Sequence, residues 1–208
     1  YAEVLRDIGR YAEAVPLAQA ATATYSRLSE ASHKDAISRA ITVMSWNNLS
    51  HAAREARQFD LAETATMKAT EGGRANLALR PKEPNTRFTL ASALVGQGRL
   101  RQAQAEREEE ARSSFDKAIA MLETLTKEFP ATASFGRRLA DALTARGELC
   151  LDAGQVPAAT ADARRAVELL ERLDQESSGA AAYQPLLASA YAVAGKVELK
   201  QGHVQPAR

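Results

Sequence analysis

The stretch GELCLDAGQVPAA, residues 147–159, decides the fold of this chain. It carries Gly154, with the small residue Gly147 seven positions before it and Ala159 five positions after it. Glycine adopts positive φ at little steric cost and commonly ends a helix. A small side chain at the point where two helices cross lets their axes approach closely. The spacing therefore predicts two antiparallel helices joined by a tight turn at Gly154.

The same spacing recurs along the chain. A turn residue is followed five positions later by alanine at Gly9 and Ala14, Arg57 and Ala62, Gly98 and Ala103, and Gly202 and Ala207. The residues seven positions before the five turns are all small: Ala2, Ser50, Ala91, Gly147 and Gly195. The predicted turns are 48, 41, 56 and 48 residues apart. Because one hairpin cannot bury its apolar face alone, we expect the hairpins to stack.

Composition supports an all-helical chain. The 208 residues are 45% hydrophobic but only 5% aromatic, and alanine and leucine, which favour helices, dominate the apolar set. We predict helices near residues 11–29, 35–56, 60–79, 86–97, 100–129, 132–153, 157–176 and 181–201. The helix over 100–129 is unusually long because no proline or glycine interrupts it between Leu100 and Phe129.

At these positions the chain resembles the tetratricopeptide repeat (TPR) family, whose first helix carries Trp, Leu, Gly and Tyr and whose second carries Ala and Phe. The residues that carry the resemblance are Trp46, Leu49, Ser50, Ala62, Ala69, Phe115, Ala118, Gly147, Gly154, Ala159, Ala163, Ala166, Tyr191, Gly195 and Gly202. The resemblance implies a right-handed α-solenoid of antiparallel helix hairpins. It would form a single domain over 1–208, with approximate repeats 1–32, 33–82, 83–130, 131–178 and 179–208.

The ends of the chain suggest a piece of a larger protein, because it starts at Tyr1 and both termini cut through a repeat. Exposed terminal repeats could also pair between chains, giving a homo-oligomer. Phe129-Pro130 and the Arg137-Arg138-Leu139-Ala140 motif resemble, more loosely, the long-spaced bacterial arrays that follow serine/threonine kinase domains. This resemblance implies the non-catalytic C-terminal part of a signalling protein. The single cysteine, Cys150, favours the reducing cytoplasm as its location.

The residue types of catalytic and metal sites are sparse. The histidines His33, His51 and His203 lie in no recognisable motif, and Cys150 is predicted to be a core residue. The chain contains no kinase motif and no metal-ligand spacing, so we expect no enzyme activity and no cofactor in this segment. With 27 basic and 26 acidic residues, and no apolar run of about 18 residues, nucleic acid and membranes are disfavoured as partners.

Binding of a protein or peptide is the remaining function that the pattern favours. In the TPR family the first helices of successive repeats line a concave groove. The equivalent residues here are Asn47, His51, Arg54, Phe88, Ser92, Thr144, Glu148 and Lys196. A generic polar surface is the alternative for this set. Two other functions also stay open: a ligand- or peptide-sensing regulatory domain of a transcriptional regulator, and an enzyme that uses Cys150.

Overall fold

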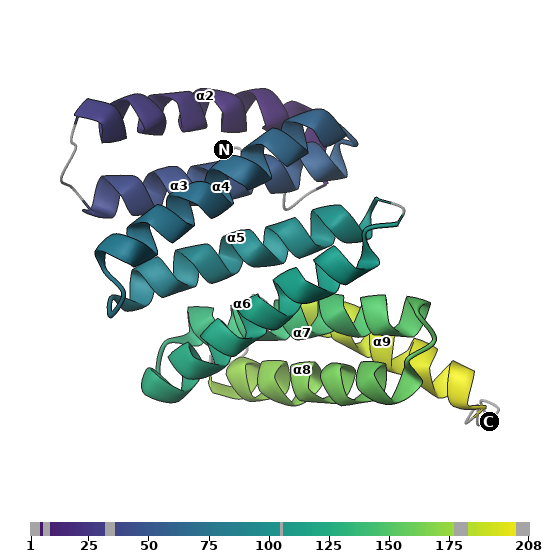
Figure 1. Cartoon of the computed structure of the whole chain (residues 1–208). Helices are drawn as coiled ribbons and strands as arrows, with labels where there is room; N and C mark the ends of the chain where they lie inside the picture. Colours follow the sequence, from purple (N-terminus) through teal and green to yellow (C-terminus); the bar gives the residue numbers. More distant parts are fainter. Residues whose placement is uncertain (1–4, 6–8, 32–35, 105, 177–182, 203–208) are drawn as a thin grey trace. The chain divides into compact units, whose positions relative to one another are not determined.

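The computed structural model describes residues 5, 9–31, 36–104, 106–176 and 183–202, and within them the protein is all-α (Figure 1). The helices are α2 (Tyr11–Ala31), α3 (Ala36–Glu55), α4 (Phe59–Leu79), α5 (Pro84–Gln102), α6 (Glu108–Glu128), α7 (Ala133–Asp152), α8 (Val156–Glu176) and α9 (Gln184–Gln201). The chain divides into two compact units, Tyr1–Ser114 and Phe115–Arg208, and the division falls inside α6. Each unit is described by itself below.

In each unit the helices that lie wholly within it pack on their neighbours in the chain. In the first unit α2 contacts α3, α3 contacts α4 and α4 contacts α5, while α3 also contacts α5. The second unit repeats this pattern with α7, α8 and α9. Alanine and leucine fill the cores, and the first unit has a buried cluster composed of Leu5, Ala14, Val15, Ala18, Leu49, Ala52, Ala53, Ala62, Ala65 and Leu100.

Five turn residues of the described chain share the left-handed backbone conformation. Positive φ occurs at Gly9, Arg57, Glu106, Gly154 and Gly202. In three of these turns the next amide donates to a carbonyl five residues earlier at 2.8 Å: Arg10 to Leu5, Gln58 to Ala53 and Gln155 to Cys150. This is the bond that closes a helix end in the Schellman motif. The positive-φ residues are 48, 49, 48 and 48 residues apart, so the turn recurs almost regularly.

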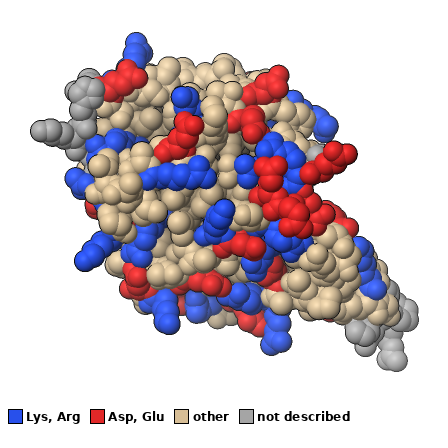
Figure 2. All heavy atoms as spheres, in the orientation of Figure 1, with Lys and Arg blue, Asp and Glu red and all other residues tan. Residues whose placement is uncertain are grey.

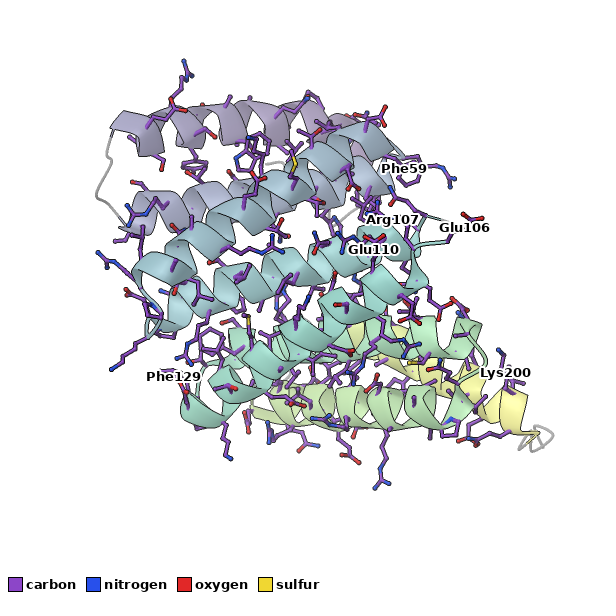
Figure 3. The ribbon with its side chains drawn as sticks, in the orientation of Figure 1. Phe59, Glu106, Arg107, Glu110, Phe129 and Lys200 are labelled. Carbon is purple, nitrogen blue, oxygen red and sulfur yellow. The ribbon has the colours of Figure 1, made fainter. Side chains whose placement is uncertain are left out.

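The sequence prediction was wrong at Gly98. That glycine lies inside α5, and the predicted helix over 100–129 is broken between α5 and α6, with Glu106 at φ 65°. The break has no glycine, and the side chain of Arg107 stabilises it by donating to Gln104 at 2.7 Å and to Glu110 at 2.9 Å. Figure 3 shows Arg107 and Glu110 together at this turn.

Moving the turn to Glu106 restores the repeat. Gly98 then replaces Ala91 as the small residue of the first helix, although it lies eight residues before the turn where Ser50 and Gly147 lie seven. Ala111, fully buried, takes the place predicted for the exposed Ala103 and joins Ala14, Ala62 and Ala159 as the crossing residue of the second helix. Of the remaining predicted positions, Gly195 lies on α9, and Ala2 and Ala207 lie outside the described residues. Equivalent positions in different repeats are counted from the small residue of the first helix and from the crossing residue of the second helix.

An ion-pair cluster centred on Arg146 joins three helices of the second unit. Its guanidinium donates to both carboxylate oxygens of Asp162 on α8 at 2.7 Å and to Asp116 on α6 at 2.8 Å. The Asp162 side chain is only 4% exposed. The hydrogen bonds to Asp162, together with the one to Asp116, raise the pKa of Arg146 above its usual range.

Candidate functional site

The structure places the predicted groove residues of α3 on one partly exposed face. Asn47, His51 and Arg54 are all half-buried. The Asn47 amide oxygen lies beside Gly96 of α5, 2.8 Å from where a β-carbon would stand. The His51 ring lies 6.1 Å from that of Tyr11, and Arg54 forms an ion pair with Glu55. Neighbouring helices therefore hold two of these three side chains, Asn47 and His51.

The assignment of Phe88 and Ser92 on α5 to the groove depended on a turn at Gly98. Gly98 instead lies inside α5. Counted from Gly98 as the small residue, the positions equivalent to Asn47 and His51 are Val95 and Arg99. Phe88 and Ser92 therefore lie seven residues, or two helical turns, from the positions intended. Ser92 is 6% exposed and Phe88 is half-buried.

The other three groove residues lie in the second unit and differ in exposure. Thr144 on α7 is buried, and its hydroxyl donates to the Ala140 carbonyl at 2.9 Å. Glu148 on α7 is half-buried, and Lys196 on α9 is exposed. Of the predicted set, the structure brings together only the three residues of α3 as a shared polar surface.

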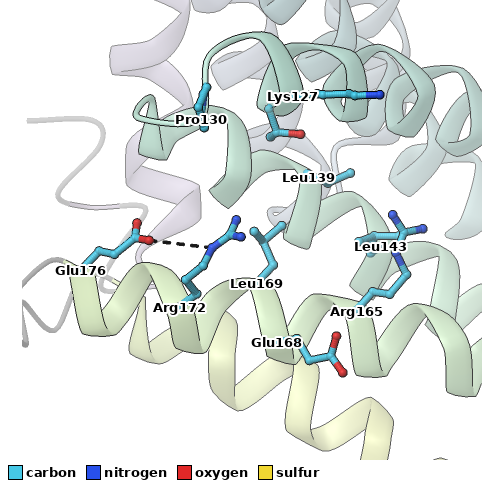
Figure 4. A pocket seen from close by; sticks show the side chains of 10 residues that line it. Lys127, Pro130, Leu139, Leu143, Arg165, Glu168, Leu169, Arg172 and Glu176 are labelled. Atoms are coloured by element: carbon cyan, nitrogen blue, oxygen red, sulfur yellow. Dashed lines mark ion pairs between the residues drawn. The ribbon is translucent and has the colours of Figure 1, made fainter.

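The second unit also contains a pocket of about 480 Å³ that the sequence did not reveal. Its apolar lining comes from Leu139 and Leu143 on α7, Leu169 on α8 and Pro130 in the connection after α6. The volume lies within the range of ordinary ligand sites. Figure 4 shows Leu169 and Arg172 reaching from α8 toward the side that carries Pro130 and Leu139. The pocket is therefore a recess of mixed polar and apolar lining between the end of α6 and the helices α7 and α8.

Charged side chains surround this recess. Basic groups are contributed by Lys127, Arg165 and Arg172, and acidic groups by Glu168 and Glu176. Arg165 pairs with Glu123 at 2.5 Å, and the Arg172 and Glu176 side chains are 3.9 Å apart (Figure 4). Glu168 is bound by Arg164 at 2.7 Å, outside the pocket lining. Among the described residues Lys127 has no ion-pair partner, so the rim has an excess of positive charge.

Part of this pocket could have been found from the sequence. Arg165, Leu169, Arg172 and Glu176 are spaced four, three and four residues apart, which places them on one face of a helix. The sequence signal for this part of the pocket is a leucine flanked by arginines on an outward helix face. The sequence does not show that Lys127, Pro130 and Leu139 also line this pocket, because their positions there depend on how α6 and α7 pack on α8.

Cys150 and the metal-ligating side chains are the groups on which catalytic or metal chemistry in this chain would depend. Cys150 is 1% exposed and packs with Leu151, Ala159 and Val197, so the prediction that it is a core residue is confirmed. No group of three His, Cys, Asp or Glu side chains close enough to hold a metal occurs within the described residues. None of the helices in that part combines the length and apolar character needed to cross a membrane. His33 and His203 lie outside the described residues.

Comparisons with known proteins give little further information. No protein-family model matches the chain, and no curated protein matches it. Among solved structures it is similar to BtubC (BKLC) from P. vanneervenii, at 15% sequence identity and a TM-score of 0.40, covering 93% of each chain. A likeness of this size supports no conclusion about function.

Proposed function

We propose that this chain is a TPR-like α-solenoid that binds a peptide segment of a partner protein, as the non-catalytic part of a larger signalling protein. The near-regular helical hairpins support the architecture, and the pocket between α6, α7 and α8 carries the binding proposal. Helical-repeat proteins present extended surfaces to partners, and peptide recognition commonly combines an apolar anchor with charges around it.

The chemistry of the pocket favours a particular peptide. Leu169 and Pro130 would contact an apolar side chain above the floor formed by the buried Leu139 and Leu143. Lys127, Arg165 and Arg172 would contact acidic residues beside it. Charges interspersed over the face shown in Figure 2 would contribute little net attraction beyond this rim. We therefore infer a ligand with one large apolar residue flanked by Asp or Glu. This site uses the outward face of α8 instead of the first-helix stripe implied by the family resemblance.

Peptide selection on the intact chain tests this proposal. We expect a random peptide display library to yield sequences with Leu, Ile or Phe flanked by acidic residues. The double charge reversal Lys127→Glu and Arg172→Glu should weaken their binding about tenfold or more, measured by fluorescence anisotropy at low salt, because rim charges act over a Debye length. The matched control is the double reversal Lys68→Glu and Lys117→Glu, at two exposed lysines that are not part of the pocket lining. Selected peptides that bind the double variant as tightly as the unchanged chain would contradict the proposal.

A further inference from the structure

The pocket between α6, α7 and α8 is long and narrow. Along α8 its lining runs from Arg165 to Glu176, about 17 Å of helix. A volume of about 480 Å³ spread over that length gives a mean cross-section of about 30 Å², or a width of about 6 Å. An α-helix with its side chains is about 10–12 Å wide, whereas an extended chain lies about 5 Å from its neighbours in a sheet. We call this recess the slot, because it admits an extended chain and excludes the body of a helix.

Packing within the second unit fixes the walls of the slot. The Phe129 ring, next to Pro130, packs edge-on against Phe135, with the ring centroids 6.2 Å apart and an angle of 79° between the ring planes. On the opposite wall Leu169 lies against α7, since a β-carbon at Gly136 would stand 3.6 Å from the Leu169 Cδ1 atom. A ligand would therefore meet a site that is already formed, which lowers the ordering cost of binding.

Two arginines of the slot hold glutamates that a ligand could replace. Arg165 binds Glu123 of α6 at 2.5 Å, and Arg172 lies 3.9 Å from Glu176. The four side chains are 42% to 64% exposed. Ion pairs as exposed as these contribute little stability, so a ligand carboxylate can take the place of either glutamate. Both guanidinium groups are therefore available to bind a carboxylate.

The order of residues along α8 sets the spacing of the ligand. Leu169 lies between Arg165 and Arg172, whose α-carbons are about 10 Å apart along the helix (Figure 4). In an extended peptide every second side chain points to the same side, and residues two apart are separated by about 7 Å. An apolar residue on Leu169 thus places the residues two before it and two after it beside the two arginines. Long arginine side chains span the remaining difference of about 3 Å.

We propose that the slot binds an extended segment of a partner protein with the pattern acid-x-apolar-x-acid, where x is any residue. The two acids bind Arg165 and Arg172, and the apolar side chain lies on Leu169 above the floor of the slot. This pattern reads the same in both directions, so the proposal holds for either orientation of the peptide. The inference rests on the proposed function and specifies the conformation and spacing of the ligand.

Three fluorescein-labelled peptides of identical composition test the spacing on the intact 208-residue chain. Each has one leucine and two glutamates in a background of serine and glycine. In the first peptide the glutamates lie two residues before and two after the leucine, in the second directly beside it, and in the third four before and three after, as one helix face would require. We expect the first peptide to bind about tenfold more tightly than the other two, measured by fluorescence anisotropy at low salt.

Charge exchange tests the arginine contacts. Arg172→Glu should weaken binding of the first peptide about tenfold, and replacing one glutamate of that peptide with lysine should restore binding to this variant, because the new pair has opposite charges. Lys117→Glu is the matched control, since it changes the net charge equally at an exposed lysine outside the pocket lining. It should alter the affinity for the first peptide by less than about twofold. Circular dichroism verifies that both variants fold.

Three results would overturn the inference. Equal affinity for the first two peptides would show that the slot senses net charge alone. Tighter binding of the third peptide would assign the site to a helical ligand. Failure of the lysine peptide to bind Arg172→Glu better than the first peptide does would remove the arginine contact. In each case, peptides of another pattern selected from the display library would leave the proposed function standing, whereas no peptide binding from either source would reject both.

Discussion

Replacing Arg146 with alanine is expected to lower the free energy of unfolding of the second unit by about 3 kcal/mol. Asp162 is 3% exposed and receives two of the hydrogen bonds from this guanidinium, so the change leaves a buried carboxylate without its cation. Removing one partner of such a pair costs more than the pair contributes, since the charge that remains is still desolvated. Urea denaturation followed by circular dichroism measures the loss.

The internal repeats supply the control for this prediction. The positions of Arg146 and Asp162 correspond to Gln97 and Ser114, joined by a hydrogen bond of 3.2 Å, and to the buried apolar pair Leu49 and Ala65. The double change Arg146→Leu with Asp162→Ala should therefore recover most of the stability. Arg164→Ala, which removes an ion pair whose side chains are 79% and 58% exposed, should cost less than about 0.5 kcal/mol. Equal losses for Arg146→Ala and Arg164→Ala would reject a structural role for the cluster.

Leu170→Ala should have the next largest effect, a loss of about 2–5 kcal/mol in the free energy of unfolding. Leu170 is fully buried on α8, in the position that Leu122 occupies on α6, also fully buried. At the equivalent position α4 has Gly73, where a β-carbon would lie 3.1 Å from the Leu90 α-carbon, so there the helix backbones occupy the space that leucine fills on α8. Truncating Leu170 would therefore leave a cavity that the backbone cannot close.

Leu199→Ala is the matched control for the cavity prediction. Its side chain is 63% exposed, so the same truncation should change the free energy of unfolding by less than about 0.5 kcal/mol. The measurement is again urea denaturation of each variant. Similar losses for the two leucines would show that Leu170 does not lie in a packed core.

The helical hairpins could be predicted because their physical signals are local. Glycine marks the turns at Gly9, Gly154 and Gly202, and Arg57 was found from spacing alone. Glu106 could not be found in this way, because Ala103, Gln104 and Arg107 around it all favour a helix. The nearby glycine, Gly98, lies inside α5, where a small residue serves helix packing. Because glycine marks the turn in other repeats, the turn between α5 and α6 was predicted at the wrong residue.

The candidate site was harder to predict than the hairpins, because it depends on how different helices pack. The assignment of Phe88 and Ser92 to a groove depended on the position of one turn. The pocket combines Lys127 and Pro130 with Leu139 of α7 and Arg172 of α8, residues brought together only by packing. A sequence pattern shows which residues share one helix face, and it does not show which faces of different helices meet around a recess.

The most direct test of the repeated hairpin is the free energy of unfolding of Glu106→Gly, measured by urea denaturation. Glu106 has φ 65°, a conformation that costs an ordinary residue about 1 kcal/mol and glycine almost nothing. With the turn at Glu106, glycine should stabilise the protein by about 0.5 kcal/mol after its larger entropy in the unfolded chain is included. A loss of about 1 kcal/mol, the cost of glycine inside a continuous helix, would contradict the turn and with it the repeat of 48 to 49 residues.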